Sequence, residues 1–166
     1  GKPPSIESLL KKNQHIMVQV SKDTLGTKGV RLTNYVTLPG RYVVLMPTVK
    51  QLGVSRKIGS ERERDRLRKD LQAVRPPGVG LILRTAGEGK KKSDFQDDVK
   101  YLSKVWSDVK EKMETAKSAA LLHADLGPIL RIVRDMFTND IEKLTVDDET
   151  EYERILEFLD SFAPSL

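Results

Sequence analysis

The chain is organised around residues 79–89, which read Val79-Gly80-Leu81-Ile82-Leu83-Arg84-Thr85-Ala86-Gly87-Glu88-Gly89. The first five of these residues are apolar apart from one glycine, and such a short run predicts a strand in the centre of a sheet. The polar residues that follow stand at the carboxyl end of this strand, where α/β sheets usually bind ligands. The stretch therefore predicts both a layered α/β architecture and the place of a binding site.

The side chains after this strand suit an anion, and a phosphate in particular. Arg84 offers a planar fork that matches two phosphate oxygens, and Thr85 adds a hydroxyl donor. Gly87 and Gly89 would let backbone N–H groups approach an anion, and the lysines at 90–92 raise the local positive potential. The alternative is an ordinary loop between a strand and a helix. The segment is neither a nucleotide P-loop nor a dinucleotide fingerprint, because glycines that those patterns require are absent.

Downstream of this loop the sequence predicts helices separated by short strands. Ser93 with Gln96 forms a capping-box signature, and the helix that follows carries one apolar stripe, typical of core packing: Phe95, Val99, Leu102, Trp106, Val109 and Met113. We expect strands at 119–124 and 142–146, a helix marked by Ile129, Val133 and Met136, and a last helix capped by Asp148 with Glu151. This alternation is typical of an α/β unit.

Upstream of the central stretch the pattern is mainly that of strands. We expect strands at 16–21, 28–38 and 41–46, a turn at Pro39-Gly40 and a loop over 48–59. Ser60 with Glu63 then starts a charged helix with Leu67, Leu71 and Val74 on one face. The first strands look like the end of a small β domain, so the predicted fold class is mixed α/β.

Charge divides the chain into two unequal halves. Residues 1–92 carry 20 Lys and Arg against 7 Asp and Glu, whereas residues 93–166 carry 9 against 17, within an overall net charge of +5. This asymmetry favours a polyanion, and a nucleic acid in particular, as the partner of the first half. The absence of cysteine excludes disulfides and thiol catalysis. No apolar run is long enough to span a bilayer, so we expect a soluble, cytoplasmic protein.

Acidic and histidine side chains give no convincing catalytic set. Carboxylates gather at two places, Asp94, Asp97 and Asp98, and Asp147, Asp148, Glu149 and Glu151. Both groups stand at predicted helix starts, where acids favour the helix dipole, although a divalent-metal site is the alternative. His15 and His123 are isolated, which favours structural roles for both. We therefore predict neither catalytic nor metal-binding residues.

Three motifs, in this order and spacing, resemble the ribonuclease E/G family of bacterial endoribonucleases. They are Gly26-Thr27-Lys28-Gly29-Val30-Arg31-Leu32-Thr33, Leu38-Pro39-Gly40-Arg41-Tyr42-Val43-Val44-Leu45-Met46-Pro47 and Gly80-Leu81-Ile82-Leu83-Arg84-Thr85-Ala86-Gly87. The resemblance covers most of the chain. It implies three parts: the closing strands of an OB-type S1 RNA-binding domain at 1–33, a 5′-sensor region at 34–125, and part of a ribonuclease-H-like domain at 126–166.

The resemblance also implies roles for individual residues. Arg84 and Thr85 would hold the 5′-monophosphate of an RNA, and Gly40 and Val44 would face the terminal nucleotide. Lys28 would lie on the S1 RNA surface and Arg56 would line the sensor. Arg41 departs from the family pattern, and we count it as a further candidate RNA contact.

The function that follows is RNA binding with 5′-monophosphate sensing, as part of an endoribonuclease that acts in RNA processing and decay. The family's magnesium-binding aspartates belong to a later domain, so we expect no cofactor and no cleavage activity in these residues, and magnesium in the parent enzyme. Exposed strand edges or the parent chain could form a homo-oligomer. Two alternatives remain: a generic RNA-binding module without end preference, and an independent metal-dependent nuclease using Asp147 and Asp148.

Overall fold

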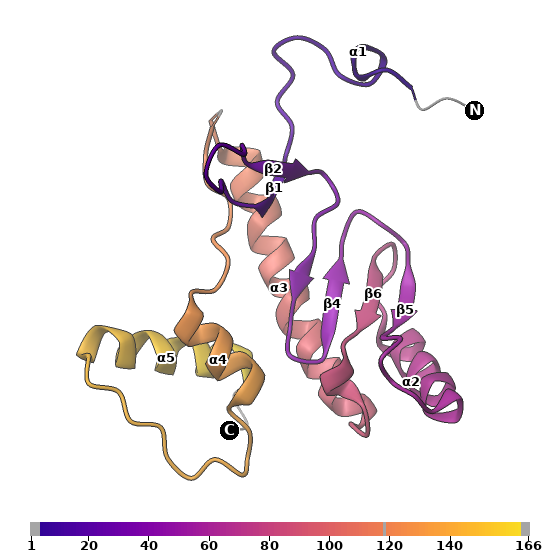
Figure 1. Ribbon diagram of the computed structural model, residues 1–166, viewed down its shortest axis with the longest axis vertical. Helices are drawn as coiled ribbons and strands as arrows, with labels where there is room; N and C mark the ends of the chain where they lie inside the picture. Colours follow the sequence, from indigo (N-terminus) through magenta and orange to yellow (C-terminus); the bar gives the residue numbers. More distant parts are fainter. Residues whose placement is uncertain (1–3, 118, 164–166) are drawn as a thin grey trace.

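The computed structural model describes residues 4–117 and 119–163, which form a mixed α/β fold (Figure 1). The strands are β1 (Gln19–Lys22), β2 (Arg31–Thr33), β3 (Leu38–Pro39), β4 (Val43–Met46), β5 (Leu52–Val54) and β6 (Gly80–Leu83). The helices are α1 (Ile6–Leu9), α2 (Glu61–Val74), α3 (Lys92–Thr115), α4 (Pro128–Met136) and α5 (Glu149–Phe162), with a single 3₁₀ turn at Thr85–Gly87. No helix of the described residues is long and apolar enough to cross a membrane.

A four-stranded sheet in the order β3-β4-β6-β5 forms the centre of the molecule. The strand predicted before Arg84 is β6, and it lies inside the sheet as expected, antiparallel to β4 and parallel to β5. The prediction of a loop over 48–59 was wrong, because β5 lies within it. Only three residues long, β5 carries no alternating pattern, and it is a strand because its backbone pairs with β6.

Two helices cover one face of this sheet and close the main core. Leu67 and Leu71 of α2 are fully buried, and Phe95, Val99 and Leu102 of α3 pack into the same cluster. The predicted apolar faces of both helices are thus confirmed near the sheet. Toward the end of α3 the stripe leaves the core, since Met113 is exposed.

The predicted helix starts were correct in two cases and wrong in one. The hydroxyl of Ser60 accepts the N–H of Glu63 at the start of α2, and the carboxylate of Asp148 accepts the N–H of Glu151 at the start of α5. The Ser93–Gln96 cap was wrong. The N-cap of helix α3 is Lys91, two residues before Ser93, and the Asp94 carboxylate accepts the N–H of Lys91 at 2.8 Å.

A second, smaller apolar cluster joins α4 and α5. Its buried members are Val133, Ile155, Phe158 and Phe162. Tyr101 of α3 contacts it by packing edge-on against both phenylalanine rings. Both helices were predicted, but the strands expected at 119–124 and 142–146 were wrong, since the described chain there is irregular. Neither segment pairs with the sheet, so the regular structure described in the last third of the chain consists of helices alone.

The N-terminal part forms a separate two-stranded sheet, with β1 antiparallel to β2. The single strand predicted at 28–38 was wrong. The hydroxyl of Thr33 accepts the N–H of Tyr35, the chain bends there, and the two ends of the predicted strand enter different sheets as β2 and β3. The side chain of Gln19 ties the hairpin to the main body through the backbone of Thr37.

Candidate functional site

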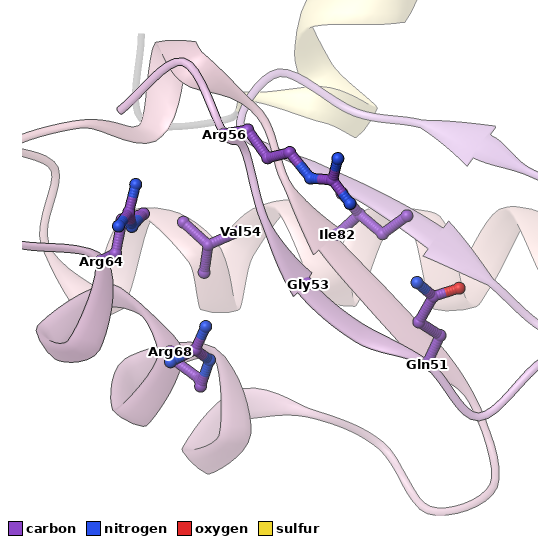
Figure 2. Close-up of a pocket in the computed structure, with 7 residues that line it drawn as sticks. All are labelled: Gln51, Gly53, Val54, Arg56, Arg64, Arg68 and Ile82. Carbon is purple, nitrogen blue, oxygen red and sulfur yellow. The ribbon is translucent and has the colours of Figure 1, made fainter. Parts of the chain in front are cut away.

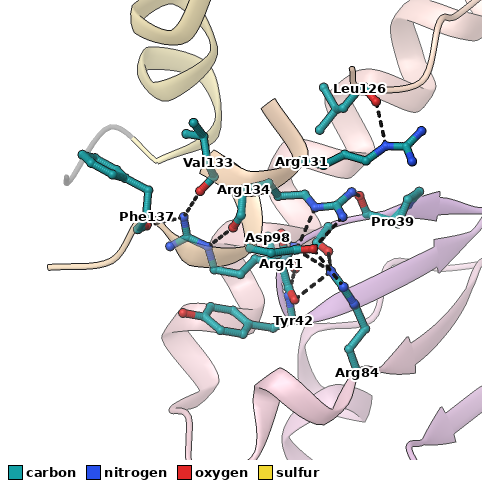
Figure 3. Close-up of polar contacts among 12 residues, drawn as sticks. Pro39, Arg41, Tyr42, Arg84, Asp98, Leu126, Arg131, Val133, Arg134 and Phe137 are labelled. Atoms are coloured by element: carbon teal, nitrogen blue, oxygen red, sulfur yellow. Dashed lines mark hydrogen bonds and ion pairs between the residues drawn. The ribbon is translucent and has the colours of Figure 1, made fainter. Parts of the chain in front are cut away.

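Arg84 leaves the end of β6 in an extended conformation and turns its side chain toward the residues after β3 (Figure 3). Its N–H donates to the carbonyl oxygen of Tyr42 at 2.7 Å, which continues the pairing of β6 with β4. Its Nη1 donates to the carbonyl oxygens of Gly40 and Arg41. The turn between β3 and β4 therefore fixes both the backbone and the tip of the residue predicted to hold phosphate.

A carboxylate on α4 meets the same guanidinium. Oδ1 of Asp135 lies 2.8 Å from Nη1 of Arg84, and Oδ2 lies 3.2 Å from its Nη2. Arg134 binds the same two oxygens through Nε and Nη2, at 2.9 and 3.0 Å. Burial alone would raise the pKa of Asp135, but the hydrogen bonds and charges of the two arginines outweigh it and hold the pKa well below the usual range. The carboxylate is therefore ionised at neutral pH.

The turn that receives Arg84 is built around Asp98 of α3. This carboxylate is 4% exposed and accepts the N–H groups of Arg41, Tyr42 and Val43 at 3.0, 2.8 and 2.8 Å. Burial raises its pKa, while the three N–H donors and the Arg41 charge act in the opposite direction. A Cβ atom on Gly40 would lie 2.3 Å from Oδ1 of Asp98, so this position has no room for a side chain.

Asp98 is therefore a positioning residue, which the sequence analysis placed among the acids of a predicted helix start. A signal for it existed. Asp98 follows Phe95 by three residues and precedes Leu102 by four, so it stands on the apolar face of its own helix. A carboxylate on that face is buried, and a buried carboxylate must have hydrogen-bond donors. Asp135 and Arg134 were also missed, and neither carries a comparable signal in the sequence.

Arg41 has a structural role that replaces the RNA contact expected of it. The residue is 8% exposed, and its guanidinium donates to the backbone carbonyl oxygens of Arg134 and Phe137. These carbonyls belong to the C-terminal end of α4, where a cation is favoured by the helix dipole. Because the guanidinium of Arg41 caps α4 in this way, Arg41 is not counted in the proposed RNA surface.

Thr85 and Val44 lie near Arg84 on two different elements. Thr85 is exposed, and its hydroxyl lies 2.9 Å from the hydroxyl of Ser55, which follows β5. Val44 pairs with Ile82 across β4 and β6, and both are half-buried, in contrast to the buried residues on either side of them. These two apolar side chains thus share the sheet face opposite the main core, two residues from Arg84.

A basic groove lies beside this face, along β5 and α2 (Figure 2). Its volume is about 480 Å³, and it is lined by Gln51, Gly53, Val54, Arg56, Arg64, Arg68 and Ile82. The three arginines face it without a carboxylate in the lining. Arg56 directly follows Ser55, whose hydroxyl lies 2.9 Å from that of Thr85. Lys28 is exposed in the N-terminal hairpin, outside this group.

The acidic groups at the helix starts do not converge. No three His, Cys, Asp or Glu side chains in the described ranges, 4–117 and 119–163, are placed to hold a metal ion. Asp148 is engaged in its N-cap and Asp98 in the turn. A magnesium site does not fit the described residues.

Comparisons with known proteins agree with the motifs. The Ribonuclease E/G family profile matches residues 37–166. The chain is 40% identical over 159 residues to Ribonuclease E of Nostoc sp. (strain PCC 7120 / SAG 25.82 / UTEX 2576), covering 96% of this chain and 23% of that protein. It is 39% identical over 161 residues to Ribonuclease G of Escherichia coli (strain K12), covering 97% of this chain and 33% of the relative. The chain thus spans about a quarter to a third of the length of these relatives. It belongs to the ribonuclease E/G family.

Proposed function

We propose that these residues bind RNA by its 5′-monophosphate, as the end-sensing region of a ribonuclease that acts in RNA processing and decay. One observation carries the proposal. Arg84 is fixed at the end of β6 with its Nη1 and one side of Nη2 occupied, while no acceptor in residues 4–117 and 119–163 is hydrogen-bonded to Nε. An arginine held in this way presents a ready pair of donors to a phosphate.

The neighbouring groups extend this site in the direction of a nucleotide. The exposed Thr85 hydroxyl can donate to a further phosphate oxygen, with Ser55 as its partner on the other side. The half-buried Val44 and Ile82 offer an apolar surface for the first base, and the Gly40 turn borders it. Arg56 lies next to Ser55 and would meet the following phosphate.

The same arrangement favours a monophosphate over the other common 5′ ends. A 5′-hydroxyl brings no charge to Arg84. A triphosphate brings two further phosphates, for which a single oriented guanidinium and one hydroxyl supply too few donors and too little countercharge. Cleavage itself is assigned to a part of the parent enzyme other than these residues, so incubation of this chain with RNA and magnesium should leave the RNA intact.

The test is a binding series with one short RNA sequence that bears a 5′-monophosphate, a 5′-hydroxyl or a 5′-triphosphate. We expect the tightest binding for the monophosphate. Arg84→Ala should remove that preference. The affinity for the monophosphate RNA should fall about tenfold or more, because a charge-assisted bidentate contact is lost. Arg62→Ala is the matched control, since Arg62 is exposed on α2 in the same basic half and should weaken all three RNAs alike.

Two outcomes would contradict the proposal. A monophosphate preference that survives Arg84→Ala would mean that another group reads the phosphate. Equal binding of all three RNAs, with a steep loss of affinity in salt, would favour a generic RNA-binding module that grips the backbone through the basic half.

A further inference from the structure

The contact between Arg84 and Asp135 raises a question about the proposed phosphate site. A carboxylate already occupies the arginine that should bind an anion, with distances of 2.8 and 3.2 Å. Asp135 either competes with phosphate for the same donors or holds the arginine so that other donors face the phosphate. These two roles predict opposite effects when the carboxylate is removed.

The geometry of the guanidinium distinguishes them. Its five N–H bonds form two edges on which a planar anion can bind with two hydrogen bonds, an end between Nη1 and Nη2 and a side between Nε and Nη2. Asp135 occupies the end, because each of its oxygens takes a different Nη atom. The carbonyl oxygens of Gly40 and Arg41 take the rest of Nη1. The side formed by Nε and Nη2 has no hydrogen-bonded acceptor in the described part of the chain.

Charge does not prevent an anion from binding at that side. The Asp135 carboxylate is shared with Arg134, whose side chain is only 7% exposed and whose fork binds both oxygens. The three groups together carry one net positive charge. Arg134 itself is anchored by donating to the carbonyl oxygen of Pro39 at 3.1 Å, so the carboxylate is held from the turn as well as from α4.

We propose that Asp135 is a positioning residue of the 5′-phosphate site, which fixes Arg84 so that Nε and Nη2 face the phosphate. The inference rests on the proposed function. Asp135 lies on α4, which itself is capped by Arg41 of the turn, so docking of the α4 and α5 helices onto the sheet is a condition for reading the phosphate. Specificity for the monophosphate then depends on a residue that never touches RNA.

The experiment compares Asp135→Asn with the unchanged chain, using RNAs of one sequence with a 5′-monophosphate or a 5′-hydroxyl. Asparagine keeps the shape but cannot bind both Nη atoms as an acceptor pair. We expect the affinity for the monophosphate RNA to fall about tenfold and the affinity for the hydroxyl RNA to stay within about twofold. Asp135→Glu, which retains the charge, should recover part of the preference.

Asp125→Asn serves as the matched control. Asp125 precedes α4 and pairs with Arg131 of that helix at 2.7 Å, but both side chains are exposed and neither contacts Arg84. It should leave both affinities unchanged. A purely structural effect of Asp135→Asn would weaken both RNAs in parallel, so the ratio between them is the decisive quantity.

A measurement on the unchanged chain covers the case in which Asp135→Asn fails to fold. During titration with monophosphate RNA, the NMR signal of Arg84 Nε should shift while the carboxyl carbon of Asp135 keeps its position. A large shift of that carboxyl carbon, or tighter binding of the monophosphate RNA by Asp135→Asn, would show that Asp135 competes with phosphate for Arg84. Either result would overturn the inference. If the unchanged chain shows no Arg84-dependent preference, the proposed function fails; if it does and Asp135→Asn retains it, only this inference fails.

Discussion

The sheet with α2 and α3 and the pair formed by α4 and α5 are held together by different forces. The first has a core of twelve buried apolar residues, from Val36 to Leu102. The second has four, and leaves Ile132, Met136 and Leu156 exposed at 59%, 67% and 44%. Arginine contacts to backbone carbonyls and to Asp135 join the two, together with the packing of Tyr101 against Phe158 and Phe162. Apolar packing thus determines the fold of the sheet region, whereas charged hydrogen bonds and one aromatic contact hold the helix pair against it.

The largest effect should come from a cavity in the larger core. Leu45→Ala on β4, where the side chain is 1% exposed, should lower the free energy of unfolding by about 3 kcal/mol in a urea titration, because it removes packed methyl groups and leaves a void. Ile155→Ala on α5 should instead reduce hydrogen-exchange protection mainly within 128–162. Equal loss of protection in the sheet for both variants would show one cooperative unit and end the comparison.

A smaller loss should follow when the link between α3 and the turn is broken. Asp98→Ala leaves three buried N–H groups without their acceptor and should cost about 2 kcal/mol in the same titration. It should also reduce the monophosphate preference, since the turn receives Arg84. Asp97→Ala, at the exposed neighbouring position, should stay within about 0.5 kcal/mol. A similar cost for both variants would contradict the positioning role of Asp98.

The smallest effect concerns acid and the helix pair. The folded pKa of Asp135 is lowered, so its contribution to stability is present above its unfolded pKa and is lost as pH falls through the folded value. Hydrogen exchange of α4 should therefore lose protection below about pH 4, by at most about 1 kcal/mol, since the pair is partly exposed. In Asp135→Asn this acid-dependent part should be missing. An identical pH profile in both proteins would mean that the ion pair adds nothing to docking.

Much of the sheet region could be predicted because its signals are local. The apolar run of β6, the cap at Ser60 and the stripe of α3 each follow from a few adjacent residues, and each was confirmed in kind. The errors over 48–59, 119–124 and 142–146 share one cause. Strand β5 exists only through its parallel pairing with β6, and the segments at 119–124 and 142–146 look like strands but find no partner. Local periodicity does not show which distant segments pair with each other.

The candidate site shows the same difference between local signals and long-range contacts. Arg84 and Thr85 could be chosen from their own neighbourhood, and the structure places them after β6, with Arg84 against Gly40 and Thr85 against Ser55. Their roles toward RNA stay predictions. The positions of Arg41, Arg134 and Asp135 depend on contacts between the turn and α4, which no local pattern reveals. Arg41 was counted as a candidate RNA contact, and its acceptors gave no local signal because they are backbone carbonyls more than ninety residues away.

The long separations in this network have a consequence for the order of folding. Arg84 and Asp135 are 51 residues apart, Arg41 and Asp98 are 57 apart, and Arg41 meets the end of α4 across 93 residues. Contacts that close such long loops form late, because the entropy of closure must be overcome before they stabilise anything. A chain still leaving the ribosome therefore exposes its lysines and arginines before Arg84 is oriented. Under the proposed function, the chain would attract RNA by charge during synthesis, and discrimination of RNA ends would begin only once α4 has emerged and docked.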